Sequence, residues 1–200
     1  MTKSFITRLS SETVDETVAT NMYYGKNETN KTRLANFEKY LNYFVVNKPK
    51  LILVGEAPGY KGCCVSGIPF TSTAVIKKSP FFRNIAVSDV EYEQNEATAT
   101  IIWEYLDKRG VYLLFWNAYP FHPHKENNPK SNLKPKKSQL ELGRTYLNEL
   151  RELFPEAKLV AVGRVAQKSL ESEGIKADYV RHPANGGKAE FIKGLDELLK

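Results

Sequence analysis

The chain has 200 residues, of which 42% are hydrophobic and 26% charged, and its formal net charge at pH 7 is +6. This length and apolar content predict one globular domain over residues 1–200. No apolar run approaches the roughly 20 residues of a membrane helix, and the amino terminus lacks the apolar core of a signal peptide, so we expect a cytoplasmic protein without a membrane partner. The charge is compatible with a polyanionic partner or merely with a basic surface.

The first 30 residues are polar and rich in threonine. Apolar side chains recur at helical spacing from Val14 to Met22, and Ser10 or Ser11 can cap a helix. We therefore predict a short amphipathic helix after these serines, within an N-terminal helical extension over residues 1–30. The apolar residues of segment 32–46 fall on one face and predict a second helix.

A buried strand and a glycine-rich loop are expected at residues 51–59. The run LILV (51–54) has the pattern of a strand buried on both faces of a parallel sheet, and the sequence GEAPG (55–59) ends it in a tight loop. Open α/β folds bind ligands at this end of their strands. The segment GIPF (67–70) follows and supplies one aromatic ring, so the two segments together suit a flat heterocycle.

Strand and helix then alternate along the chain. Short apolar runs predict strands at residues 111–116, 158–162 and 177–181, and periodic segments predict helices at 71–78, 95–109, 138–154, 164–173 and 188–199. Right-handed crossovers would bring all four strand ends to one edge of a parallel sheet. The sequence thus predicts an α/β fold, a three-layer αβα sandwich with a central four-stranded parallel sheet.

Two of the later strand ends also carry polar residues. Asn117 ends the second strand, and His182-Pro183 ends the last one. The loop after Asn117, residues 118–137, holds five lysines and one glutamate and is the most basic segment of the chain. A loop longer than about 12–15 residues is usually functional or disordered, which favours a functional role over a merely solvated loop.

GEAPG, GIPF, an Asn that closes a middle strand and a His-Pro before the last helix occur here in that order. Together they resemble the motifs of the uracil-DNA glycosylase superfamily. The spelling is most similar to its bacterial and archaeal branches, including the thermophile-type family four, and VAVGRVAQKSLESEGI (160–175) resembles the strand, turn and helix before their His-Pro. The resemblance covers roughly residues 51–199.

The resemblance implies a monofunctional DNA glycosylase of base-excision repair. It would hydrolyse the N-glycosidic bond of uracil, or a related deaminated base, after the base is flipped into a pocket. Phe70 would stack on the base, and the Asn117 amide would pair with uracil O4 and N3–H. A core phenylalanine and a strand-terminal Asn turn are the alternatives for these two residues. Gly55 and Ala57 would line the base site.

His182 is implied as a hydrogen-bond donor to uracil O2 as negative charge develops there. Many members, though not the GEAPG-type branches, carry Asp or Asn at the position of Ala57 to orient the attacking water, and an alanine cannot do this. Glu56 is the nearest carboxylate; it either substitutes or is a solvated loop acid. Gly59 stands where the most uracil-specific branch has a tyrosine that excludes a C5 methyl group, so the range of accepted bases is open.

No cofactor is expected. Family four holds an iron–sulfur cluster with four cysteines, but this chain has only Cys63 and Cys64, which are adjacent, so we predict no cluster and no metal. His122 and His124 lack acidic or Cys partners, and we predict that they belong to a DNA-facing loop.

DNA would bind the strand-end edge through phosphate contacts. The predicted contacts are Lys125, Lys130, Lys134, Lys136, Lys137, Arg181, Asn185 and Lys188. The tip at residues 184–187 is small, which predicts weak wedging into the duplex and a preference for single strands or mismatches. A monomeric enzyme is expected. The alternatives are a non-catalytic member that binds nucleic acid or a free base, and, less favoured because it needs no basic loop, a nucleoside hydrolase.

Overall fold

The computed structural model describes residues 1–25, 27–88 and 94–200 of the chain. Its main sheet has four parallel strands in the order β3-β2-β5-β6. These strands are β2 (Leu51–Gly55), β3 (Leu114–Asn117), β5 (Lys158–Val162) and β6 (Asp178–Val180). A separate antiparallel pair joins β1 (Ala19–Thr20) to β4 (His122–Pro123). The predicted α/β fold with a four-stranded parallel sheet is confirmed.

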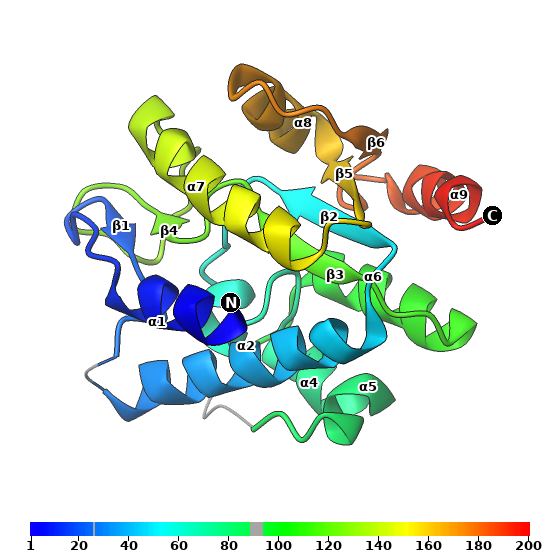
Figure 1. Cartoon of the computed structure of the whole chain (residues 1–200), viewed down its shortest axis with the longest axis horizontal. Coiled ribbons are helices and arrows are strands. Elements are labelled where there is room, and N and C mark those ends of the chain that lie inside the picture. The colour runs from blue at the N-terminus through cyan, green and yellow to red at the C-terminus, as the bar shows by residue number, and fades with distance from the viewer. Residues whose placement is uncertain (26, 89–93) are drawn as a thin grey trace.

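Helices flank the sheet (Figure 1). They are α1 (Thr2–Ser11), α2 (Glu28–Asn47), α3 (Cys63–Ser66), α4 (Thr73–Lys78), α5 (Pro80–Asn84), α6 (Ala97–Arg109), α7 (Lys137–Leu153), α8 (Gly163–Ser172) and α9 (Lys188–Leu198). Two adjacent residues of β3 contact helices on opposite faces of the sheet, because successive side chains of a strand point to opposite faces. Phe115 packs on Trp103 of α6, whereas Trp116 packs on α1 and α2 through Phe5 and Phe37.

The sheet is buried because both of its faces are covered. All five residues of β2 are buried, as the unbroken apolar run predicts. The free edge of β3 is closed by the Tyr40 hydroxyl, which donates to the carbonyl of Leu113 and accepts from the N–H of Phe115. The register pairs Gly55 with Asn117, so the ends of β2 and β3 lie side by side.

The N-terminal helix lies earlier than predicted. It spans Thr2–Ser11 and ends at the serines, whereas residues 12–18 form no helix. The reason is tertiary packing: Phe5, Ile6 and Leu9 are buried, and α1 contacts both α2 and α7 (Figure 1). The Asn21 amide then fixes the following segment by donating to the carbonyls of Leu9 and Glu12.

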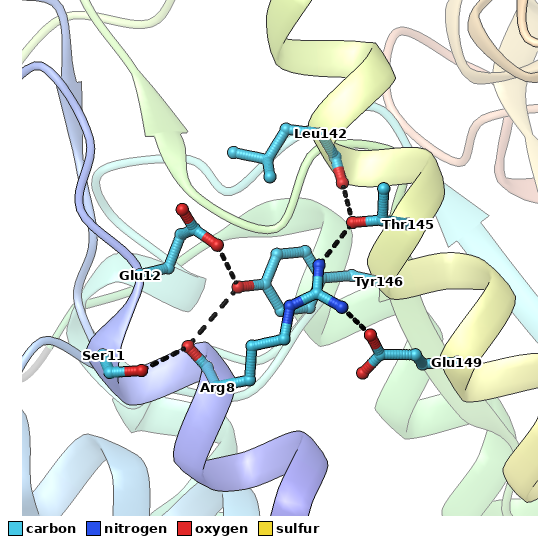
Figure 2. Close-up of polar contacts among 7 residues, drawn as sticks. All are labelled: Arg8, Ser11, Glu12, Leu142, Thr145, Tyr146 and Glu149. Atoms are coloured by element: carbon cyan, nitrogen blue, oxygen red, sulfur yellow. Dashed lines mark hydrogen bonds and ion pairs between the residues drawn. The ribbon is translucent and has the colours of Figure 1, made fainter.

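Polar contacts complete the docking of α1 on α7 (Figure 2). The Tyr146 hydroxyl donates to Glu12 Oε2 at 2.7 Å, and the Arg8 guanidinium stacks on the Tyr146 ring. Arg8 also pairs with Glu149 and donates to the Thr145 hydroxyl. The N-terminal residues therefore pack closely against the main body.

Candidate functional site

A cavity of about 730 Å³ opens at the carboxyl ends of the four parallel strands. Eight of the predicted site residues line it: Gly55, Glu56, Ala57, Phe70, Asn117, Arg181, His182 and Asn185. They come from segments far apart in the sequence, and the parallel topology brings them together. The six predicted DNA-contacting lysines, described below, do not line this cavity.

Gly55 is the point at which the loop, the ring and the amide meet. A Cβ at this residue would lie 2.5 Å from the Phe70 ring and 2.7 Å from Asn117 Oδ1, so only glycine lets both side chains approach. Phe70 has φ +53°, an uncommon conformation for a residue with a side chain. Trp103 Nε1–H holds it there by donating to the Phe70 carbonyl. The ring is half-buried and faces the cavity, which differs from a core phenylalanine.

Asn117 is 4% exposed and ends β3 beside Gly55. Its side-chain amide has no hydrogen-bond partner among the described residues. The structure therefore leaves a donor and an acceptor at the wall of the cavity, available to a bound molecule.

His182 follows β6 and also lines the cavity. The backbone N–H of Ala184 donates to its Nδ1 at 3.2 Å, so Nδ1 is an acceptor and the neutral ring carries its proton on Nε2. Burial, and then the nearby charge of Arg181, lower the pKa of His182 below its usual value of 6.5. The ring is thus a neutral Nε2–H donor. Gly163, with φ +87°, makes room for it, since a Cβ there would lie 2.9 Å from His182 Cβ.

Glu56 contains a carboxylate oxygen, Oε1, that is buried and has no hydrogen-bond partner among the described residues. Burial raises the pKa of this carboxyl, and the charge of Lys134 partly opposes the rise. A solvated loop acid would show neither property. Beside it, the backbone N–H groups of Ala57 and Gly59 also lack acceptors among the described residues.

Glu96 is a cavity residue that sequence reasoning missed. It precedes α6, and its carboxylate lies so close to the Cα of Gly62 that any side chain there would collide with it. Burial raises its pKa. No motif marks this glutamate, and its position follows only from the path of the chain before α6. The sole sequence signal is the glycine at position 62.

The long loop after β3 contains two buried histidines. That His122 and His124 belong to a DNA-facing loop stays a prediction, but their own rings are not at its surface, since each residue is 1% exposed. Their ring nitrogens lie within hydrogen-bonding distance of the Thr20 hydroxyl and of the backbone carbonyls of Pro58, Lys125 and Pro129. Asn132 and Leu133 of the same loop do reach the cavity.

The predicted DNA-contacting lysines are exposed but lie outside the cavity wall: Lys125, Lys130, Lys134, Lys136, Lys137 and Lys188. Lys188 lies 3.7 Å from Glu104 of α6, which partly neutralises it. Lys136 and Lys137 begin α7, where the Lys136 N–H donates to Gln139 Oε1. Helix α7 therefore begins one residue before the predicted Ser138, and Gln139 closes its N-terminal cap. Asn185, at the predicted tip, is exposed and has φ +53°.

In the described part of the chain, no three His, Cys, Asp or Glu side chains gather closely enough to hold a metal ion. Cys63 and Cys64 are free thiols. None of the described helices is long and apolar enough to cross a membrane.

Comparisons with known proteins bear on the fold and the family. A search of curated protein sequences gives no match. The fold is similar to that of the crystal structure of wild-type SMUG2 from Pedobacter heparinus, with a TM-score of 0.68 and 14% identity over 99% of this chain and 96% of that one. The family model for the uracil DNA glycosylase superfamily matches residues 41–194, a range that holds every motif named above. The chain therefore belongs to the uracil DNA glycosylase superfamily.

Proposed function

We propose that this protein is a monofunctional DNA glycosylase that removes uracil, or a related deaminated base, from DNA. The observation that supports this most is the convergence of Asn117, Phe70 and His182 on one cavity at the strand ends. The cavity offers an unpartnered amide, an aromatic face and a neutral N–H donor, which are the groups needed to bind a flipped uracil.

The proposed binding step begins with a base turned out of the stack. Phe70 would cover one face of the base, and the Asn117 amide would donate to O4 and accept from N3–H. Cytosine has an amine in place of O4 and lacks the N3–H, so it would set donor against donor at this amide. The unmatched contact would leave a buried polar group unpaired, which typically costs about 1–3 kcal/mol.

In the proposed chemical step the bond between C1′ of the deoxyribose and N1 of the base breaks, and the bonding electrons leave with the base. His182 Nε2–H would donate to O2, where negative charge develops, and the N–H groups of Ala57 and Gly59 would add to this stabilisation. A water molecule would then bond to C1′ and give its proton to Glu56, whose raised pKa makes it a better base. The products would be a free base and an abasic site.

DNA would approach the same edge from the side of the basic loop and Arg181. The chain would act as a monomer in the cytoplasm and without a cofactor; these three statements remain predictions.

The test is release of the free base from single- and double-stranded oligonucleotides that carry one uracil, hypoxanthine or xanthine, scored by alkaline cleavage. Native protein is expected to release at least one of these bases, and His182→Ala to slow release about 10²–10³-fold, the usual cost of one lost charge-stabilising donor. Binding of DNA without release of any base would favour a non-catalytic member, in which Ala57 replaces the water-orienting residue.

A further inference from the structure

One buried histidine, His122, connects the long loop after β3 to the glycine-rich loop at residues 55–59. The ring of His122 lies between the two segments and is 1% exposed. Its Nδ1 lies 2.7 Å from the carbonyl oxygen of Pro58, and its Nε2 lies 3.1 Å from the carbonyl oxygen of Pro129. Pro58 belongs to the segment Gly55–Gly59, whose backbone lines the cavity.

Each of these contacts needs a proton on the ring nitrogen, because a carbonyl oxygen only accepts. A neutral imidazole has one N–H, and burial lowers the pKa of His122, which favours the neutral ring. The contact with Pro58 is the shorter and is fully buried, whereas the contact with Pro129 is partly exposed, so water can replace it. This geometry favours the proton on Nδ1.

The surroundings of His122 hold its ring in place. The neighbouring His124 ring is bound on both sides, with Nδ1 2.8 Å from the Lys125 carbonyl and Nε2 3.1 Å from the Thr20 hydroxyl. Residue 122 itself pairs with Thr20 in the β1–β4 ribbon. A second contact joins the same two loops, since the Tyr60 N–H donates to Asn132 Oδ1 at 3.2 Å.

We propose that His122 is a positioning residue of the base pocket, which donates from Nδ1 to Pro58 and thereby fixes the segment Gly55–Gly59. The unpartnered N–H groups of Ala57 and Gly59 are then held at the cavity wall, where a leaving base would need them. Groups of this kind act only when their supporting contacts hold them within a fraction of an ångström. The catalytic part of this inference rests on the proposed function.

Two substitutions separate the roles of the two nitrogens. In His122→Asn the amide nitrogen can replace Nδ1, and in His122→Gln it can replace Nε2. The Asn variant is expected to keep kcat for base release within about threefold of native. The Gln variant is expected to lose about 10–100-fold in kcat with little change in KM, as is usual when a supporting contact is lost. Equal losses in the two variants, in proportion to their Tm values, would overturn the proposal.

Two measurements do not depend on activity, so they test the inference even if native protein releases no base and the proposed function fails. Amide hydrogen exchange in residues 55–62 is expected to quicken in His122→Gln and to stay native in His122→Asn. If the Gln variant does not fold, ¹⁵N spectra of the histidine rings of native protein give the tautomer directly. A proton on Nε2 of His122, or unchanged exchange in the Gln variant, would contradict the assignment.

Discussion

A single backbone contact determines which nitrogen of the His182 ring carries the proton: the N–H of Ala184 donates to Nδ1, so the proton lies on Nε2. Burial lowers the pKa of the ring from 6.5, so we expect the acid limb of base release to be centred below pH 6.5, where a protonated Nδ1 would oppose the Ala184 N–H. The native pKa lies below the unfolded one, so this group's stability contribution is intact above pH 6.5 and is lost as pH falls. A pH–rate profile of single-turnover release checks this; an acid limb centred above pH 6.5 would contradict it.

Glu56 is held in the native state at a cost in stability. Burial raises its pKa, so the native state disfavours the ionised carboxylate. We expect Glu56→Gln to raise the Tm at pH 7 by a few degrees and to reduce base release at least 10²-fold. The gain in Tm should shrink as pH falls towards about 4.5, because Glu56 of the native protein then becomes protonated and no longer carries a buried charge.

The same substitution at the exposed Glu141 is the control for Glu56→Gln and should change neither quantity. If Glu56→Gln lowers the Tm at pH 7, or leaves release unchanged, the carboxylate does not have the strained, functional role described here.

Among the single residues of the candidate site, the sequence predicted correctly the position of those that directly follow a strand. Asn117 and His182 each follow a short apolar run directly, so their place at one edge of the sheet follows from topology alone. Glu96 could not be found in this way, because its carboxylate reaches the cavity through packing on Gly62. The burial of His122 and His124 could not be found from the sequence for a related reason, since hydrogen bonds from a long loop have no periodic signal.

Helix α7 approaches the site so closely that one of its positions requires glycine. A Cβ on Gly143 would collide with the carbonyl of Ala118, the residue that follows Asn117. We expect Gly143→Ala to cost about 1–3 kcal/mol of stability, as overpacking usually does, because backbone atoms cannot give way as a side chain can. Displacement of Ala118 should also slow base release.

Gly25→Ala is the matched control for Gly143→Ala, because a Cβ at Gly25 would meet only the Tyr23 carbonyl, at 3.9 Å. Thermal unfolding of both variants measures the difference. A native Tm for Gly143→Ala would show that α7 can move away from Ala118 without cost.

The helices and strands were predictable where a pattern was long or fully buried, as in α2 and β2. The N-terminal helix was placed too late because the apolar spacing from Val14 to Met22 matched a helix by chance. Burial of Phe5 and Leu9 decides the true position, and the Phe5 ring packs on Tyr146 of α7, which lies more than 130 residues further along the chain.

For the whole molecule, the net charge of +6 and the basic loop predict an electrostatic share of DNA binding. Lys125→Glu with Lys137→Glu should weaken binding similarly for all sequences. If each lysine neutralises one phosphate, the slope of log K against log salt should decrease in magnitude by about 2. A fluorescence titration over a range of salt concentrations gives the slope.

The control is Lys3→Glu with Lys108→Glu, which makes the same change in net charge at exposed sites of α1 and α6. This control pair should leave the slope of log K against log salt close to that of native protein. If the two pairs have equal effects, the loop is not the contact surface and only the overall charge matters.

The most direct test of the account is single-turnover release of uracil from a single-stranded oligonucleotide by native protein and by Asn117→Ala. The account predicts release by native protein and at least 100-fold slower release by the variant, with an unchanged Tm, because the amide reads the base and supports no other described residue. Equal rates in the two proteins, or no release by a native protein that still binds the DNA, would contradict it.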